Sequence, residues 1–397
     1  MKISLSEVLA SLRASIRTPT RLGAEGPEAF EQGETRSRMP GLREVDGALV
    51  DNWYIACLSE ELGREKPLAR TVYEYPIALW RDREGRAQAV LDRCLHRATR
   101  LSEGRCEGDH LRCPYHGWSF DGGGRVREIP SEGPQALPLE TCERRGLKLR
   151  SFPVVEQDGA VWVWTGEPAR ATAAPPWRFP YAGDARWSQY FMITDFENEV
   201  THLVENFMDV PHTVFVHDKW FRSRTLKKIP ITVEVGGGRV KVTYDQPQDQ
   251  IGFTGRILNP RNEPMLHTDE FIFPNITRVD YSFGDSGFVI NSQCTPVGRY
   301  RSRVYTWIAF NLGPVVTPAA KPFMQYYTRQ VIEQDVEIMR NQGRNLQRFD
   351  ERGEGTAFKS TAADELHLAI ERLRDLGARG ESSWREIAWT RDREIHV

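Results

Sequence analysis

Two cysteine–histidine pairs are the first residues of this chain whose types and spacing could do chemistry. Cys94-Leu-His96 is followed, sixteen residues later, by Cys113-Pro-Tyr-His116 and then Gly-Trp. Two thiolates and two imidazoles can bind one Zn²⁺ tetrahedrally. They can also bind a [2Fe–2S] cluster, with two cysteines on one iron and two histidines on the other. Because each loop mixes the ligand types, where zinc knuckles usually pair cysteine with cysteine, the spacing favours the iron–sulfur site over structural zinc.

A second set of possible ligands lies in the segment that contains Asp209, His212 and His217. On a regular helix the two histidines would lie about 140° apart, so they could not share a metal ion. Pro211 should disturb the helix between them and allow both rings to reach one point.

A third ligand is expected from Asp335. Its neighbours one helical turn before and after it are apolar, so Asp335 should point from the buried face of its helix; they are Val331, Ile332, Ile338 and Met339. A buried carboxylate needs a partner or a metal ion. Two histidines and one carboxylate make the facial triad of non-haem Fe(II) oxygenases, which leaves positions open for O₂. The alternative is that Asp335 pairs with a buried arginine.

The elements that must position the first set are short strands and turns between Trp53 and Trp164. β-rich runs cover Thr71–Trp80, Ala87–Leu91 and Val161–Trp164, and the segment Ala169–Pro176 has the composition of a linker.

The second set should lie in a domain of different architecture. The pattern predicts a helix over Glu197–Val210, antiparallel strands over residues 230–310, a long helix over Ala319–Leu346 and a charged helical tail. The fold class is therefore α+β, with an all-β domain over residues 46–170 and a sheet-plus-helices domain over residues 171–397.

Residues 1–45 are predicted to form a helix and an exposed arm. Apolar residues recur at helical spacing near the start of the chain; they are Leu5, Val8, Leu9, Leu12 and Ile16. We expect this helix to dock on the protein body or on a neighbouring subunit in the cytoplasm. An organellar transit peptide and membrane-surface binding are the alternatives.

The composition excludes several other classes of protein. The 397 residues contain 53 Lys and Arg against 55 Asp and Glu, a net charge of −2, which argues against a globally basic nucleic-acid-binding protein. No apolar run approaches the ~18 residues of a membrane-spanning helix. Six cysteines are too few for a disulfide scaffold.

Taken together, the two sets resemble the Rieske non-haem iron oxygenases. The first set follows the pattern Cys-x-His-x₁₆-Cys-x₂-His, and the second follows Asn-x₂-Asp-x₂-His-x₄-His from Asn206 to His217, with Asp335 on a later helix. The resemblance covers residues 50–340. It implies a Rieske [2Fe–2S] cluster on Cys94, His96, Cys113 and His116, and a mononuclear Fe(II) on His212, His217 and Asp335. It also implies a helix-grip catalytic domain and a head-to-tail homotrimer, in which Asp209 links His116 of one subunit to His212 of the next.

The function that this resemblance implies is that of an oxygenase component. A separate NAD(P)H-dependent reductase, with or without a ferredoxin, would deliver electrons to the cluster, and O₂ would be activated at the iron. The short Asn206–Asp209 spacing is similar to that of the branch without a second subunit type, such as vanillate O-demethylase and pheophorbide a oxygenase. Monooxygenation, such as hydroxylation or demethylation, is therefore favoured over ring dihydroxylation. A Rieske electron carrier with a ligand-binding second domain and a zinc-stapled binding protein are alternatives from other classes.

The substrate pocket is expected between the 197–217 segment, the 265–310 strands and the 320–340 helix. Six residues of these segments are predicted to line it: Asn206, Phe207, Val210, Trp307, Phe310 and Met324. An aromatic lining suits a hydrophobic, aromatic or polycyclic small molecule.

Overall fold

A computed structural model describes residues 49–133, 135–217, 228–245, 259, 263–355 and 358–396 of the 397. All of them belong to one compact unit, residues 41–397. The helix and arm predicted for residues 1–45 lie outside the described residues.

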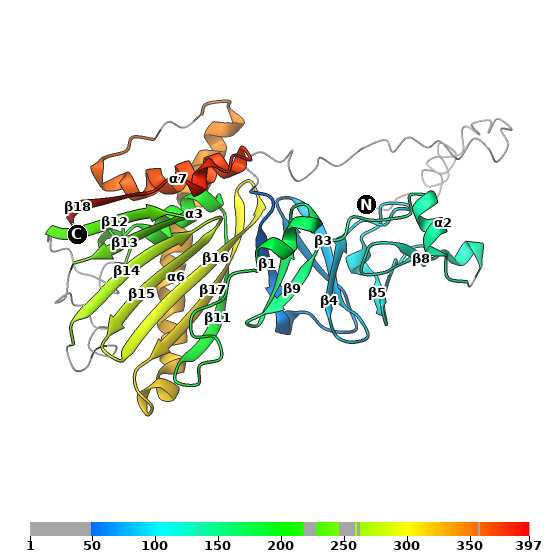
Figure 1. The fold of residues 1–397 in the computed structure, drawn as a ribbon, viewed down its shortest axis with the longest axis horizontal. Coiled ribbons are helices and arrows are strands. Elements are labelled where there is room, and N and C mark those ends of the chain that lie inside the picture. Colours follow the sequence, from blue (N-terminus) through cyan, green and yellow to red (C-terminus); the bar gives the residue numbers. More distant parts are fainter. Residues whose placement is uncertain are drawn as a thin grey trace, which may run out of the picture. The chain divides into compact units, whose positions relative to one another are not determined.

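The N-terminal region, residues 53–164, consists of three small antiparallel sheets (Figure 1). Their strand orders are β1-β10-β9, β2-β3-β4 and β5-β6-β7-β8. The bounds are β1 Trp53–Leu58, β2 Leu68–Val72, β3 Tyr75–Arg81, β4 Ala87–Leu91, β5 Arg105–Glu107, β6 His110–Arg112, β7 Ser119–Phe120, β8 Val126–Glu128, β9 Val154–Gln157 and β10 Ala160–Trp164, with helix α2 at Leu139–Arg144.

The β-rich run predicted over Thr71–Trp80 is two strands rather than one. Tyr73 and Glu74 have φ angles of 48° and 63° and form the tight turn of the β2–β3 hairpin. Two consecutive residues with positive φ are typical of the hairpin turns whose twist matches the strands. This turn could not be predicted from the sequence, because it contains neither glycine nor asparagine.

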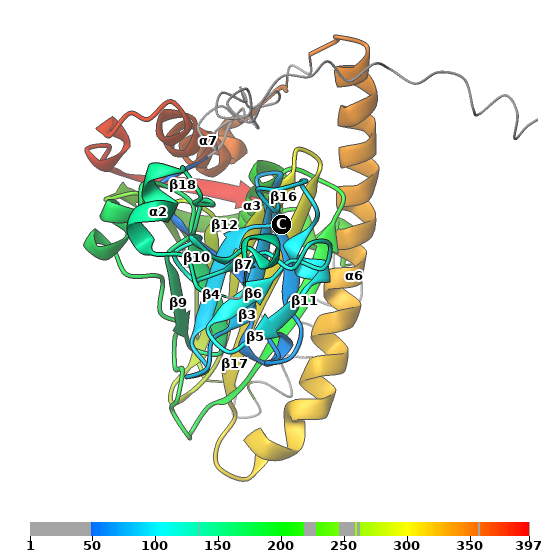
Figure 2. The same ribbon diagram turned by 90° about the vertical axis from the view of Figure 1, so that its right-hand side faces the viewer.

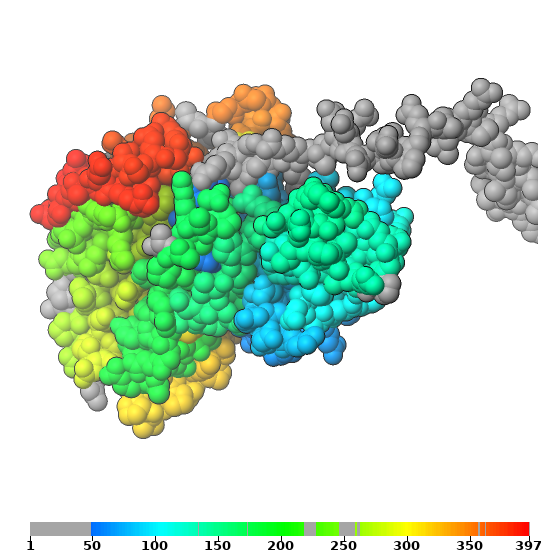
Figure 3. Space-filling view, turned by 45° about the vertical axis from the view of Figure 1, so that its right-hand side comes forward, coloured from blue at the N-terminus to red at the C-terminus, as the bar shows by residue number. Residues whose placement is uncertain are grey.

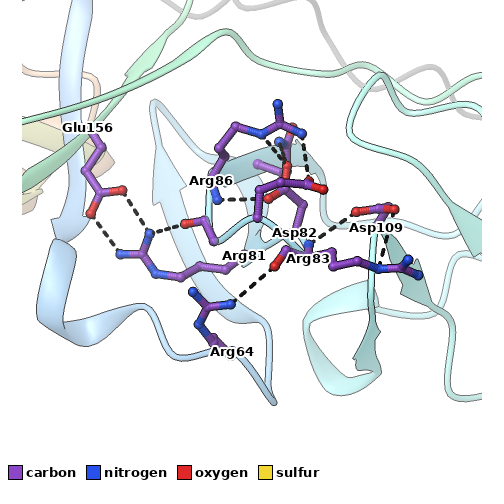
Figure 4. Close-up of polar contacts among 10 residues, drawn as sticks. Arg64, Arg81, Asp82, Arg83, Arg86, Asp109 and Glu156 are labelled. Carbon is purple, nitrogen blue, oxygen red and sulfur yellow. Dashed lines mark hydrogen bonds and ion pairs between the residues drawn. The ribbon is translucent and has the colours of Figure 1, made fainter.

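Ion pairs on the surface of this region fix the β3–β4 hairpin (Figure 4). Both terminal nitrogens of Arg81 donate to Glu156 at 2.8 Å, which ties the end of β3 to β9. Asp82 is 5% exposed and accepts bonds from the backbone and side chain of Arg86. A bidentate pair such as Arg81–Glu156 joins the two sheets more firmly than a single exposed ion pair would.

The C-terminal region, residues 188–396, is an eight-stranded antiparallel sheet with helices on one face (Figures 1 and 2). The strand order is β11-β17-β16-β15-β14-β13-β12-β18. The bounds are β11 Ser188–Phe196, α3 Val200–Met208, α4 Thr213–Val216, β12 Lys228–Gly236, β13 Arg239–Tyr244, β14 Met265–Ile272, β15 Ile276–Phe283, β16 Ser286–Gly298, β17 Arg301–Asn311, α6 Val316–Glu351, α7 Glu365–Ala378 and β18 Trp389–His396. The predicted α+β, helix-grip fold is confirmed.

The long helix α6 lies against the same face of the sheet as α3. Its buried residues include Met324, Ile332, Asp335 and Met339, which recur at helical spacing. At Gly343 a Cβ atom would lie 2.0 Å from the carbonyl oxygen of Glu197, so glycine allows the helix to approach the chain just before α3 closely.

Strand β17 divides two cores because its residues alternate between the faces of the sheet. Val304, Ile308 and Phe310 belong to the core beneath the helices. Tyr305 and Trp307 belong to a second core, which also contains Trp53 and Trp162 of the N-terminal region. The segment predicted as a linker forms part of this boundary as the 3₁₀ helix Pro168–Ala173.

Hydrogen bonds also join the two regions across this boundary. Thr295 donates to the carbonyl of Ile55 at 2.8 Å, and Tyr305 donates to that of Ala56 at 2.7 Å. In the space-filling view the blue-to-cyan residues of the N-terminal region contact the green residues of the C-terminal region (Figure 3). The boundary is therefore packed like a core rather than spanned by a loose tether.

The charged tail predicted to be helical is a helix followed by a strand. After α7 the chain returns as β18 and pairs with β12 along its whole length, from Lys228 opposite His396 to Val235 opposite Trp389. Six of the eight side chains of β18 are exposed and four of these are charged, which is typical of a strand at the edge of a sheet.

Candidate active site

His212, His217 and Asp335 converge on one point beneath the sheet. One ligand atom from each lies within 4.8 Å of the others. Nε2 of His217 is 3.2 Å and Nε2 of His212 is 3.5 Å from Oδ1 of Asp335. The predicted break in the helix is present: α3 ends at Met208, and the chain turns through Pro211 into the short helix α4. This break brings both imidazoles to one side, as the sequence predicted.

In each of the two imidazoles, the nitrogen that points away from Asp335, Nδ1, already forms a hydrogen bond. Nδ1–H of His217 donates to Oε1 of Gln334 at 2.8 Å, and Nδ1–H of His212 donates to the carbonyl oxygen of Asp209. Such bonds fix the tautomer and leave Nε2 unprotonated for a metal ion. Oδ1 of Asp335 is buried and has no well-aligned hydrogen bond, although two imidazoles face it. A divalent cation would satisfy this oxygen, so the donor set fits the mononuclear iron of the facial triad.

The surroundings of Asp335 favour the ionised form of its carboxyl group, which is the form that binds a metal ion. Burial raises the pKa of this carboxyl, but its interaction with the facing imidazoles of His212 and His217 outweighs burial, and the net shift of the pKa is downward. Burial raises the pKa of Asp209, while its attraction to His212 opposes that shift. The pKa of Asp335 is therefore shifted downward and that of Asp209 upward, so the negative charge is favoured at Asp335.

The cysteine–histidine pairs lie on two loops of the N-terminal region, before β5 and between β6 and β7. Cys94 and Cys113 are 2% and 3% exposed, whereas His96 is partly exposed and His116 is exposed. The imidazoles of His96 and His116 lie 4.4 Å apart, and the His96 ring stacks on Trp118 at 5.1 Å. The loops thus place two thiols inside and two imidazoles outside.

The spacing of these four donors decides between the two chemistries that the sequence left open. A single tetrahedral zinc ion requires its ligand atoms to lie within about 4 Å of one another. Among the described residues, these four donors do not form a group of three within 4.8 Å. An elongated [2Fe–2S] cluster, which separates its thiolates from its imidazoles, fits this arrangement better. Nδ1 of His96 is also buried without a hydrogen-bond partner, as expected for a metal ligand.

A cavity opens beside the three-residue centre, between α3, α6 and the sheet. It offers about 130 Å³ to water-sized molecules, and its lining includes His212, His217 and Asp335. Most of the lining is apolar. Asn206, Phe207 and Val210 line it as predicted.

Trp307, Phe310 and Met324 do not line this cavity. Trp307 points to the opposite face of β17, where its ring stacks on Phe179 at 5.3 Å. Phe310 and Met324 are fully buried in the core beneath the helices. On β17 the neighbours Thr306 and Ile308 face the cavity instead.

Two protein-family models match this chain, in the same order along the sequence as the two sites. Residues 52–153 match the model of the Rieske [2Fe-2S] domain, and residues 197–375 match that of the vanillate O-demethylase oxygenase C-terminal domain. The chain belongs to the Rieske non-haem iron oxygenases. The family's two cofactors are a Rieske [2Fe–2S] cluster and a mononuclear iron, and the second fits His212, His217 and Asp335.

The relatives that this chain resembles include proteins named as demethylases and oxygenases. It is 37% identical over 195 residues to the oxygenase component of dicamba O-demethylase from Stenotrophomonas maltophilia, a match that covers 49% of this chain and 55% of that protein. It is 26% identical over 325 residues to aminopyrrolnitrin oxygenase from Pseudomonas fluorescens, covering 78% and 88%. The chain spans about half the length of the first curated relatives that it matches. Other relatives are chloroplast proteins, such as pheophorbide a oxygenase of Oryza sativa.

The solved structures agree over a longer stretch of the chain. The structure of dicamba monooxygenase bound to 3,6-dichlorosalicylic acid superposes with a TM-score of 0.72 at 26% identity, covering 83% of this chain and 98% of that one. None of the helices in the described ranges is both long and apolar enough to cross a bilayer.

Sequence reasoning missed Gln334, which orients His217. The signal is weak, because glutamine before Asp335 differs little from any polar residue on a helix. We expect Gln334→Ala to lower the affinity for the mononuclear iron by about 10–100-fold, since the imidazole loses the bond that holds its tautomer. Iron content after dialysis against graded Fe(II) concentrations measures this effect.

The matched control is Gln330→Ala, one turn earlier on the same helix. Gln330 bonds to Glu333 on the exposed side, so its removal should leave the iron affinity unchanged. Equal iron binding by both variants would show that Gln334 does not orient the ligand.

Proposed function

We propose that this chain is the oxygenase component of a multicomponent system, which uses O₂ and reductant to oxidise a hydrophobic ring compound. One observation carries the proposal. The centre formed by His212, His217 and Asp335 opens directly into a mostly apolar cavity, and the same chain presents the two cysteine–histidine loops. An electron carrier would need the loops but not the second centre.

The residues divide the work between the two sites. Cys94, His96, Cys113 and His116 are proposed to hold the cluster, and the amide groups of His96 and Arg97 donate to the sulfur of Cys94. When bound, the two cofactors supply electrons and the activation of O₂. Gln334 and the carbonyl of Asp209 keep both ligand imidazoles in one tautomer. The apolar walls of the cavity position the substrate and exclude water.

Monooxygenation is the reaction type that we favour. The relatives carry names such as dicamba O-demethylase and toluene-4-sulfonate monooxygenase, which denote demethylation and monooxygenation. Ring dihydroxylation is the second candidate within the family. Mass analysis of the ring product made under ¹⁸O₂ separates them. Dihydroxylation introduces two labelled atoms and hydroxylation introduces one, whereas O-demethylation introduces none, because its inserted oxygen leaves with formaldehyde.

The assembly is proposed to be a homotrimer served by a separate NAD(P)H-dependent reductase, with or without a ferredoxin. Figure 1 shows the β5–β8 sheet on the side of the N-terminal region that faces away from the eight-stranded sheet. His116 is exposed there, and the side chain of Asp209 is 26% exposed near the other centre. Electron transfer between neighbouring subunits is compatible with both exposures. None of the six cysteines forms a disulfide, and the four outside the proposed cluster, Cys57, Cys106, Cys142 and Cys294, are free thiols, which suits a reducing compartment such as the cytoplasm.

The test is metal analysis of the anaerobically purified protein, followed by turnover with a reductase. We expect three iron atoms and two acid-labile sulfides per chain, because the cluster contributes two of each and the second centre contributes one iron. Two irons with two sulfides would identify an electron carrier, and zinc without sulfide would identify a zinc-stapled protein. Either result would overturn the proposed function.

A further inference from the structure

A buried polar group lies in the wall of the cavity, apart from the metal ligands. His267 and Asp269 on β14 both line the cavity and are 1% and 2% exposed. They lie on the same face of the strand because side chains alternate with a period of two residues. Nothing in the two recognised motifs accounts for a histidine and a carboxylate at this place.

The position of His267 is fixed by rings on both sides. Tyr244 of β13 and Tyr281 of β15 are its register partners on the neighbouring strands. Both rings stack on the imidazole, with centroids at 4.3 Å and 4.2 Å and interplanar angles of 14° and 15°. The imidazole therefore cannot tilt, and only its edge is available for hydrogen bonds.

Hydrogen bonds define what that edge offers. Nε2–H of His267 donates to Oδ1 of Asp269 at 2.9 Å, and the hydroxyl of Tyr244 donates to Oδ2 at 2.9 Å. Both oxygens of the Asp269 side chain therefore act as acceptors, which places a proton on Nε2 of His267. With its proton on Nε2, the imidazole presents Nδ1 as a bare acceptor.

This acceptor has no partner within the protein. Nδ1 of His267 is buried and forms no hydrogen bond. An unsatisfied buried polar atom costs about 1–3 kcal/mol, which a ligand that donates to it would recover. By contrast, the hydroxyls of Ser292 and Thr306 in the same cavity bond to each other at 3.1 Å. Among the described residues of the sheet that line the cavity, Nδ1 of His267 is the buried side-chain atom that lacks a hydrogen-bond partner; on the helical side, Oδ1 of Asn206 is another.

We propose that Nδ1 of His267 accepts a hydrogen bond from a hydroxyl group of the substrate. The substrate class is then a neutral ring compound that carries a hydroxyl, such as a phenol. An ether lacks the donor, and a carboxylate would bring a second negative charge beside buried Asp269. This inference rests on the proposed function, because it takes the cavity to be the substrate site.

The experiment measures binding by calorimetry to the anaerobic, iron-loaded protein without reductant, so no turnover is needed. Three single-ring probes are compared: 4-chlorophenol, its methyl ether 4-chloroanisole, and 4-chlorobenzoate. We expect the phenol to bind about tenfold more tightly than the ether, which is the size of one buried hydrogen bond, and more tightly than the benzoate. No preference for the phenol, or a preference for the benzoate, would overturn the proposal.

Two variants assign the preference to His267. His267→Phe keeps a ring between the tyrosines but removes the acceptor, and the phenol-to-ether ratio should fall to about one. In Asp269→Asn the amide donates to Nε2, so the proton moves to Nδ1; the preference for the phenol should disappear or shift to the ether. An unchanged tenfold ratio in these variants would overturn the proposal. Asp269→Asn carries the test alone if His267→Phe does not fold.

Controls separate this inference from the proposed function. Ser292→Ala changes another polar group of the cavity and should keep the tenfold ratio. His212→Ala, which lacks the mononuclear iron, should also keep it; loss of the ratio there would place the hydroxyl on the iron and overturn the proposal. Failure of metal analysis and turnover would refute the proposed function instead, since the binding ratio is read without either.

Discussion

His212→Ala is expected to contain two iron atoms per chain instead of three, with its turnover lowered by at least about 100-fold and the red colour of the cluster retained. The imidazole supplies one of three donors within 4.8 Å of one another, and the remaining pair cannot hold the ion at this centre. The cluster loops share no residue with α3 or α4. Iron and sulfide analysis together with the visible spectrum measures the two effects separately.

The matched control is His202→Gln on α3, the helix that precedes His212 in the chain. Nδ1 of His202 lies 3.1 Å from Glu205 and takes no part in the three-residue centre. This variant should keep three irons and its turnover. Full turnover by His212→Ala would show that the iron lies elsewhere.

Much of this site could be predicted because its ligands belong to local patterns. Asp335 could be assigned to the buried face of α6 from four apolar neighbours alone. Pro211 explained how His212 and His217 could meet. In both cases the information lay within one or two helical turns, the range over which sequence spacing determines direction.

The cavity could not be predicted in the same way, because it depends on which strands become neighbours. Trp307 and Ile308 are both buried, one in each core, so alternation could not tell which of them faces the cavity. The orientation of His267 depends on Tyr244 and Tyr281. These are 23 and 14 residues away in the sequence and contact His267 only because of the register of three strands. β18 was missed for a related reason, since a charged edge strand lacks the apolar alternation that identifies buried strands.

Asp209→Asn is the prediction that tests how the two sites work together. We expect both metal centres to remain, because the Asp209 carbonyl that orients His212 belongs to the backbone and survives the change. We expect turnover to fall by about 100-fold, because the carboxylate, 3.8 Å from Nδ1 of His212, is proposed to accept from His116 of the neighbouring subunit. Rapid mixing of the reduced protein with O₂ and substrate measures the step directly, as the rate at which the cluster is oxidised. Wild-type rates in this variant would refute the bridging role.

In the proposed homotrimer, assemblies of two different variant chains would separate an electron path between subunits from a path within one chain. A His116→Ala chain should lack a working cluster, and a His212→Ala chain should lack the mononuclear iron; each homotrimer is expected to be inactive. Co-expression of the two chains with different affinity tags yields hybrids in which an intact cluster faces an intact iron centre across a subunit boundary. If electrons cross that boundary, the hybrids should regain a substantial fraction of wild-type turnover, and Asp209→Asn in the chain that retains His212 should abolish the gain.

The same Asp209→Asn change in the chain that already lacks His212 is the matched control and should leave the gain in turnover intact. Inactive hybrids that contain both metal centres would mean that electrons do not pass between neighbouring chains, and that the carboxylate of Asp209 serves its own centre alone.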